Sequence, residues 1–211
     1  MRFYVPATLA QEAVNKVLYI RSCIENYNTI GPNACRRSTS DLLEFCCGHL
    51  DRKINLLEHS STHLNHKIIS FFVKYDDHYD VVYLRDLNKC WKRFAICKEL
   101  FHAILDDPSN CNPNVANHVN SMFAIEIARE MTREGGATDM ENVAEIAAGE
   151  YLFPYSERKR ILANKLIDYS AIAQQFLIPR YYVELLLNEQ SMTALGNLSY
   201  KNSIEIKNED D

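Results

Sequence analysis

A helical pattern of apolar residues occupies the middle of the chain, from Trp91 to Leu105. At about 100° per residue, the apolar side chains fall on two faces of one helix. The first face holds Trp91, Phe94, Ala95, Phe101 and Leu105, and the second holds Ile96, Leu100, Ala103 and Ile104. A helix with two apolar faces is buried on most sides. Lys98 lies in the first face and His102 follows one turn later, so both need polar partners inside the protein.

Short apolar segments before this helix predict strands. Residues 66–74 and 79–85 alternate or run apolar on either side of the polar segment Tyr75–His78, which is typical of a β-hairpin. The segment Lys53–Glu58 predicts a further short strand.

Three histidines, His59, His63 and His66, fall between the first strand and the hairpin. Their spacing resembles that of a metal site, but their neighbours are serine, threonine and asparagine. Residues of these types are mostly exposed, so we interpret the segment as a polar turn between two strands.

Helical periodicity also flanks the central helix on both sides. It predicts helices over residues 6–26, 40–50, 117–133, 140–153 and 156–165. Ser40 suits the N-cap of the second of these helices, and Thr138 or Asp139 begins the fourth. Asp86 or Asn88 is the expected cap of the central helix. The fourth helix carries small residues that allow close packing against a neighbour: Ala144, Ala147, Ala148 and Gly149.

The carboxyl-terminal part of the chain divides into two segments. Residues 168–188 predict two short helices around Ile178 and Pro179, an outline that is also typical of a helix-turn-helix motif. Because this segment carries little positive charge, we interpret it as a two-helix cap packed on the core. From Gly196 the chain is polar and ends in Asn208-Glu-Asp-Asp211, which predicts a disordered acidic tail.

Length and composition fit a single domain. The chain has 211 residues and a hydrophobic fraction of 47%, which is ample for a core. The predicted elements are mainly helical with a small antiparallel sheet, so the expected fold class is α+β. We divide the chain into N-terminal helices (1–50), a core (51–165), the two-helix C-terminal cap (166–195) and the tail (196–211).

Charge and cysteine content restrict the environment. The net charge of −5 argues against nucleic acid as the main partner. We expect a cytoplasmic protein without membrane contact, since the sequence has neither a signal peptide nor a run of about 18 apolar residues. The seven cysteines form no C-x-x-C pair, so we expect free, mostly buried thiols. They are Cys23, Cys35, Cys46, Cys47, Cys90, Cys97 and Cys111.

The central helix contains a sequence that departs by one residue from the motif H-E-x-x-H. In that motif, two histidines one turn apart bind zinc, and the glutamate after the first histidine activates water. This chain has Lys98-Glu99-Leu-Phe-His102. The glutamate and the second histidine are therefore present, and a lysine stands in the place of the first histidine.

Three segments together resemble the ImmA/IrrE family of zinc-dependent endopeptidases. Arg93–His102 is similar to the family's R-F-T-x-A-H-E-x-x-H. Glu141–Pro154 is similar to its E-x-x-A-x-x-F-A-A-x-x-L-x-P, with departures at Ala147 and Gly149. Residues 168–188 are similar to the segment that often follows. The order and spacing of these segments imply a mainly helical, zincin-like domain.

The resemblance also implies roles for individual residues. His102 and Glu141 would be two of three zinc ligands, and Glu99 would be the general base. Lys98 occupies the place of the remaining ligand. The family cleaves helix-turn-helix repressors, often to induce stress or mobile-element genes, so the implied partner is a protein of that kind.

Lysine is a poor replacement for a histidine ligand. It must lose a proton to bind zinc, and its ordinary pKa is about 10.4. Two protein ligands fall short of the three usual in catalytic zinc sites. His118 or Cys97 is a possible third ligand, although Cys97 points about 100° away from Lys98 on the helix. We therefore expect no metal cofactor, with zinc only if the site is functional, and a structural ion pair between Lys98 and Glu141. In the alternative, Lys98 extends to the surface.

Three functions follow from these observations. The first is a catalytically impaired pseudo-peptidase that binds a protein partner such as a helix-turn-helix repressor. The second is an active zinc metallo-endopeptidase with an unusual ligand set, and the third is a nucleic-acid-binding regulator that uses residues 168–188. Metal content separates the first two, and steep salt dependence of binding marks the third. The sequence alone leaves enzymatic activity open.

Overall fold

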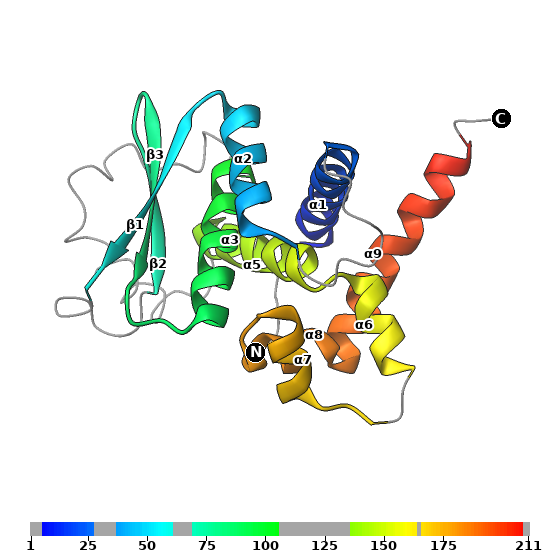
Figure 1. The fold of residues 1–211 in the computed structure, drawn as a ribbon. Coiled ribbons are helices and arrows are strands. Elements are labelled where there is room, and N and C mark those ends of the chain that lie inside the picture. The colour runs from blue at the N-terminus through cyan, green and yellow to red at the C-terminus, as the bar shows by residue number, and fades with distance from the viewer. Residues whose placement is uncertain (1–5, 28–36, 61–68, 106–135, 164–165, 209–211) are drawn as a thin grey trace.

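The computed structural model describes residues 6–27, 37–60, 69–105, 136–163 and 166–208, with the backbone alone at 26–27, 136–139 and 199–208. Figure 1 shows a small sheet at one end of the molecule and helices over the rest. The fold class is α+β and mainly helical, as the sequence predicts. In chain order the elements are α1 (Ala7–Tyr27), α2 (Thr39–Leu50), β1 (Lys53–His59), β2 (Ser70–Lys74), β3 (His78–Leu84), α3 (Lys89–Leu105), α5 (Gly136–Leu152), α6 (Tyr155–Leu162), α7 (Tyr169–Phe176), α8 (Arg180–Leu187) and α9 (Glu189–Asn208).

The sheet is mixed, with strand order β1-β3-β2. The β2–β3 hairpin is antiparallel, which confirms the predicted hairpin. β1 runs parallel to β3, so the prediction of a wholly antiparallel sheet is wrong. Local alternation and a short turn identify a hairpin, whereas the direction of β1 depends on the longer connection that carries the chain past β3 to β2. β3 lies in the middle and buries Tyr79, Val81 and Leu84.

Two helix starts differ from the sequence prediction. The N-cap of α2 is Ser38 rather than Ser40, because the Ser38 hydroxyl accepts hydrogen bonds from the backbone N–H groups of Ser40 (3.1 Å) and Asp41 (3.3 Å). α5 begins at Gly136, before the predicted Thr138 or Asp139. The cap of α3 is Asn88, one of the two candidates, whose side-chain oxygen accepts from the Trp91 N–H at 3.1 Å.

The core is organised around α3, which lies between the sheet and the other helices (Figure 1). Side chains of α1, α2, α5, α7 and α8 join those of α3, β1 and β3 in one buried cluster. The Arg93 guanidinium of α3 donates to the backbone carbonyls of Arg37 and Phe176, and thereby ties α3 to the segment before α2 and to the end of α7. The N-terminal helices and the two-helix cap thus share the core of the central segment.

The two short helices of the predicted cap are present as α7 and α8. The Asp168 carboxylate caps α7 by accepting from the N–H groups of Ser170 (2.9 Å) and Ala171 (3.0 Å). The apolar faces of the two helices are buried in the common core through Ile172, Ala173, Phe176, Val183 and Leu186. This packing agrees with a structural cap.

The chain is helical where the sequence predicts a disordered tail. α9 continues to Asn208, so that prediction is wrong for the backbone from residue 196 to 208. This polar segment and the residue before it contain two leucines one turn apart that contact α1. Leu195 is buried in a small cluster with Ala10 and Val14 of α1, and Leu198 packs against this cluster. This contact stabilises the first half of α9 at a point where sequence composition alone favours disorder.

Several predictions fall on residues outside those described. The helix over 117–133, the turn containing His63 and His66, and the thiols of Cys35 and Cys111 belong to this group. The five cysteines that the structure describes are free, as predicted; Cys46 and Cys97 are buried, and the other three are partly exposed. In the described part of the chain, no helix combines the length and hydropathy needed to cross a membrane.

A buried ion pair joins α5 and α6. The Arg158 guanidinium of α6 is fully buried and donates to the carboxylate of Glu150 on α5. The same carboxylate accepts from the Tyr155 N–H at 2.9 Å, at the start of α6. Glu150 therefore neutralises Arg158 and also satisfies an N–H group at the beginning of a helix, which holds α6 in position against α5.

Two helical glycines offer a matched test of this packing. A Cβ added at Gly149 of α5 lies 3.2 Å from the methyl groups of Leu186 on α8, whereas one added at Gly48 of α2 meets nothing within 4 Å. We predict that Gly149→Val lowers the free energy of unfolding by about 1–3 kcal/mol through overpacking. We predict that Gly48→Ala raises it by about 0.5–1 kcal/mol, because alanine favours a helix more than glycine does. Urea unfolding measures both; a stabilised Gly149→Val variant contradicts the close α5–α8 packing.

Candidate functional site

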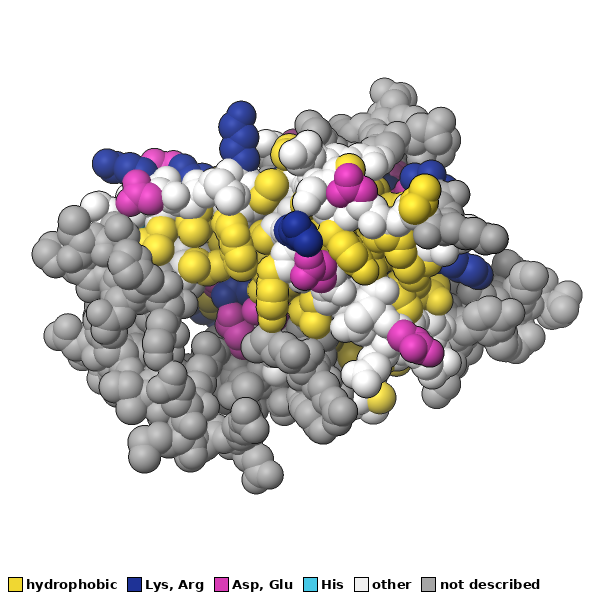
Figure 2. Space-filling view, turned by 90° about the horizontal axis from the view of Figure 1, so that it is seen from below, with side chains coloured by type: hydrophobic (Ala, Val, Ile, Leu, Met, Phe, Trp, Pro, Cys, Tyr) yellow, Lys and Arg dark blue, Asp and Glu magenta, His cyan; other side chains and the backbone are white. Residues whose placement is uncertain are grey.

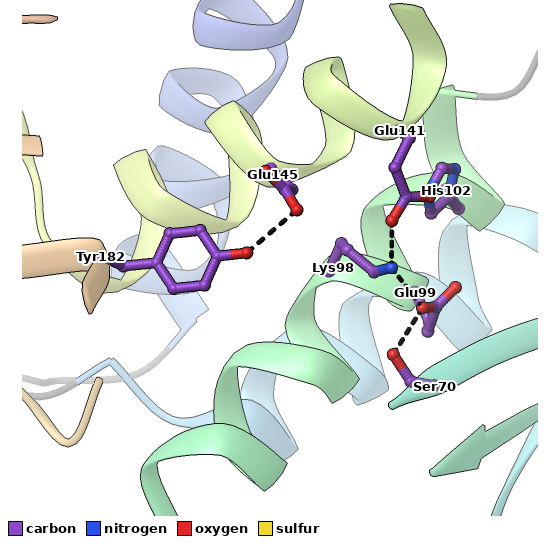
Figure 3. Close-up of polar contacts among 7 residues, drawn as sticks. All are labelled: Ser70, Lys98, Glu99, His102, Glu141, Glu145 and Tyr182. Carbon is purple, nitrogen blue, oxygen red and sulfur yellow. Dashed lines mark hydrogen bonds and ion pairs between the residues drawn. The ribbon is translucent and has the colours of Figure 1, made fainter. Parts of the chain in front are cut away.

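The residues singled out in the sequence meet where α3, α5 and β2 come together. α3 supplies Lys98, Glu99 and His102, and α5 supplies Glu141 (Figure 3). Lys98 and His102 are one turn apart, so both point from α3 toward α5, and Glu99 turns toward the sheet. Glu141 stands near the start of α5, 43 residues after Lys98.

Lys98 is buried between two carboxylates. Its side chain is 8% exposed, and its ammonium nitrogen lies 3.0 Å from Glu99 Oε1 and in direct contact with Glu141 Oε1. The expected Lys98–Glu141 ion pair is therefore present, and the alternative in which Lys98 extends to the surface is wrong. A buried cation requires such partners because removing its charge from water is costly.

Glu141 bridges Lys98 and His102. Its second carboxylate oxygen, Oε2, lies 2.9 Å from His102 Nε2. The imidazole of His102 is stacked against the ring of Phe72 on β2, with centroids 6.5 Å apart and planes inclined by 7°. Phe72 thus holds the ring of His102 in an orientation that directs Nε2 to Glu141.

Glu99 is held from the opposite side by the sheet. The hydroxyl of Ser70 on β2 donates to Glu99 Oε1 at 2.7 Å, and Glu99 is only 3% exposed. The same oxygen faces the ammonium of Lys98 at 3.0 Å. A general base must present a free oxygen to water or substrate. Here one carboxylate oxygen of Glu99 is engaged by both Ser70 and Lys98.

The electrostatics of the site keep its ions charged. Burial by itself lowers the pKa of Lys98, but the charges of Glu99 and Glu141 and their hydrogen bonds outweigh burial and raise that pKa above its ordinary value. Burial raises the pKa of Glu141, but Lys98 and the hydrogen bond with His102 reverse the effect, and the pKa ends well below its usual range. Lys98 therefore remains an ammonium at neutral pH and is unsuited to act as a base or a metal ligand.

The donor set does not fit a catalytic zinc ion. His102 and Glu141 supply a nitrogen and a carboxylate, but the third position holds the ammonium of Lys98, which contacts the same carboxylate. Among the residues that the structure describes, no three histidine, cysteine, aspartate or glutamate side chains come together as a ligand set. Of the two substitute ligands considered, His118 lies outside the described residues.

Cys97, the other substitute ligand, faces away from the site. It is fully buried, and burial raises the pKa of its thiol to about 12. Its polar neighbours are Arg93 and Thr39, and its charge raises the pKa of Cys46. Because Thr39 and Cys46 belong to α2, Cys97 lies on the side of α3 that faces α2. A thiol with a raised pKa is a poor zinc ligand, since zinc binds the thiolate.

Sequence reasoning missed three participants. Ser70 and Phe72 lie two residues apart on β2, and both face α3. The period of two along a strand puts them on one face, but it does not tell which element that face contacts. The third is Tyr182 of α8, whose hydroxyl donates to Glu145 Oε1 at 2.9 Å, one turn after Glu141 on α5 (Figure 3). A buried tyrosine needs a partner for its hydroxyl, which is the signal that was available for Tyr182.

Comparisons with known proteins leave the family open. No protein-family model matches the chain, and no curated protein matches it. Among solved structures, the chain is similar to a Mycobacterium tuberculosis transcriptional regulator, with 12% sequence identity and a TM-score of 0.46. The match covers 86% of this chain and 46% of the other, so this chain spans less than half the length of that protein. A likeness at this level assigns no function.

The depressed pKa of Glu141 makes a prediction about acid stability. The ionised Glu141 carboxylate contributes fully to stability above the ordinary glutamate pKa of about 4.3. This contribution is lost as the pH falls from there toward the lowered pKa of Glu141 in the folded protein. At pH 7, Glu141→Gln should lower the free energy of unfolding by about 3 kcal/mol, the lower end for loss of one partner from a buried ion pair. The difference from the natural protein should shrink below about pH 4.

Urea unfolding between pH 7 and pH 2 measures this dependence. Glu157→Gln is the control, since Glu157 forms an exposed pair with Arg160 one turn later in α6 and its loss should change stability by less than about 1 kcal/mol. A Glu141→Gln effect that stays constant with pH contradicts the ionised pair.

Proposed function

We propose that this protein is an ImmA/IrrE-like regulatory protein that is catalytically impaired and acts by binding a protein partner. One observation carries the proposal: the ammonium of Lys98 contacts both Glu99 and Glu141, the two carboxylates that the resemblance assigns to general base and metal ligand. Lys98 supplies the positive charge that a metal supplies in an active member of the family. The loss of the metal ligand is then compatible with a stable fold, because the carboxylates keep a counter-ion.

Chemical arguments favour a binding function over catalysis at this site. An activated water needs a Lewis acid or a free base, and one oxygen of Glu99 is engaged by both Ser70 and Lys98. Lys98 keeps its proton because its pKa is raised. These features support a role in which the site stabilises the junction of α3 and α5 rather than turning over a substrate.

The surface beside the site supports a protein partner. Tyr181 of α8 is 45% exposed, and its ring packs edge-on against Tyr182 at 5.1 Å, while Trp91 contacts Tyr182 edge-on at 5.8 Å. Figure 2 shows hydrophobic side chains gathered in a band across the face that carries α7 and α8. Tyrosine and tryptophan are enriched at protein interfaces. The choice of a helix-turn-helix repressor as partner rests on the family resemblance, and the net charge of −5 disfavours nucleic acid.

Metal content tests the impaired site. We predict that the purified natural protein binds no zinc in elemental analysis, before or after incubation with zinc and gel filtration. We predict that Lys98→His takes up one equivalent, because it restores two histidines one turn apart with Glu141 as the third ligand. A Lys98→Met variant is the control, since it removes the ammonium without adding a donor, and it should remain free of zinc.

The alternatives give different results in the same experiments. The active metallo-endopeptidase is supported if the natural protein binds one equivalent of zinc and cleaves a repressor, and if a chelator removes both the zinc and the cleavage activity. Binding to DNA that weakens steeply with salt supports the nucleic-acid-binding regulator. Either result contradicts the proposed function.

The partner surface is tested with a panel of purified helix-turn-helix repressors from the same genome. We predict that one of them binds the natural protein without being cleaved, and that Tyr181→Ala weakens this binding by about tenfold or more. Tyr75→Ala is the matched control, because Tyr75 is also exposed, at 41%, but lies on the β2–β3 hairpin. Equal affinities for the natural protein and the Tyr181→Ala variant contradict this surface.

A further inference from the structure

An arginine of α1 lacks an acceptor among the described residues. Arg21 is half-buried, and its Nε atom is buried without a hydrogen-bond partner. In the part of the chain that the structure describes, no carboxylate forms an ion pair with its guanidinium. A guanidinium always keeps its charge in a protein and carries five N–H donors, so a buried N–H without an acceptor is costly. This cost points to an anion that binds Arg21.

The two carboxylates near Arg21 are engaged by other arginines. Glu25 lies one turn after Arg21 on α1, and its carboxylate contacts the Arg37 guanidinium at 2.5 Å. Glu150 of α5 contacts the guanidinium of Arg158. The charges of both carboxylates act on Arg21, but each already neutralises another arginine. The described residues of this cluster therefore carry one positive charge in excess.

The excess charge lies between Arg21 and Arg37. Burial and the charge of Arg37 lower the pKa of Arg21, and the nearby carboxylates oppose this shift without reversing it. The remaining neighbour, Tyr151, supplies no charge at neutral pH. Burial raises the pKa of its hydroxyl, which donates to the Ser38 carbonyl at 2.9 Å. The repulsion between the two guanidiniums is thus left for an added anion to relieve.

The geometry of the cluster favours phosphate over a carboxylate. Glu25, the carboxylate already present, contacts Arg37 and leaves Arg21 without an ion pair. A phosphate monoester carries about 1.5 to 2 negative charges near pH 7 and has three acceptor oxygens, and the planar fork of arginine binds such oxygens in pairs. We propose that Arg21 and Arg37 together bind a phosphate group, either as free phosphate or as the monoester of a small molecule.

This phosphate site is accessible and separate from the candidate functional site. Arg21 is half-buried and the side chain of Arg37 is 16% exposed, so both reach solvent. They belong to α1 and to the segment before α2, whereas the candidate functional site is built from α3, α5 and β2. Phosphate binding therefore does not depend on the proposed function.

Isothermal titration calorimetry of the full chain with inorganic phosphate tests the proposal. At pH 7 and constant ionic strength, we expect saturable binding of about one equivalent with a Kd of about 1 mM or lower. Arg21→Gln should weaken binding by about tenfold or more, because it removes one of two guanidiniums. Arg180→Gln is the matched control: Arg180 is an exposed arginine that pairs with Glu184 on α8, and its loss should leave the Kd unchanged.

Thermal unfolding separates loss of the ligand from loss of folding. Without phosphate, Arg21→Gln should unfold at the same temperature as the natural protein or higher, since it removes an uncompensated cation. Phosphate at about 10 mM should raise the Tm of the natural protein by about 2 °C or more over chloride of equal ionic strength, and should not raise that of the variant. An Arg21→Gln variant that unfolds at a lower temperature without phosphate indicates a purely structural arginine and overturns the proposal.

The choice of titrant distinguishes the source of the phosphate group. Tighter binding of glycerol 3-phosphate than of inorganic phosphate supports a small monoester as the ligand, and weaker binding supports free phosphate. The proposal is overturned if the natural protein shows no saturable binding up to about 20 mM, if Arg21→Gln binds phosphate equally well, or if acetate binds as tightly as phosphate. These results leave zinc content and repressor binding unchanged, so they are distinguishable from failure of the proposed function.

Discussion

The burial of one ammonium group determines how the centre of this protein is arranged. Lys98 points into the interior from a helix that is buried along most of its length, and a cation in that position needs anionic partners. Glu99 comes from the same helix, and Glu141 comes from α5. The orientation of α3 against α5 therefore follows from a charge requirement as well as from apolar packing, and β2 completes the arrangement by holding Glu99 through Ser70.

The same requirement connects structure to function. In an active H-E-x-x-H site, a metal ion neutralises the carboxylates and activates water. Under the proposed function, a lysine at the first position neutralises the carboxylates but does not activate water. In that proposal, binding uses the surface that carries the exposed Tyr181 and the half-buried Trp91. On this account, the site now serves as an internal support for that surface.

Much of this arrangement could be predicted from local patterns. The β2–β3 hairpin follows from alternation around a polar turn. The pairing of Lys98 with Glu141 follows from the cost of a buried charge, together with the resemblance of Glu141–Pro154 to a segment of the ImmA/IrrE family. Features that depend on tertiary contacts were missed. The parallel direction of β1 and the contacts of Ser70 and Phe72 with α3 are set by how the sheet packs, and α9 forms where Leu195 reaches α1. Sequence periodicity contains none of these relationships.

A double-mutant cycle between Lys98 and Glu141 tests the central claim most directly. Urea unfolding of the natural protein, Lys98→Met, Glu141→Gln and the double variant gives the coupling free energy between the two side chains. If the ammonium and the carboxylate stabilise each other as described, each single variant is strongly destabilised, the double variant recovers part of the loss, and the coupling is about 1.5 kcal/mol or more. Single-variant effects that add to within about 0.5 kcal/mol contradict the account.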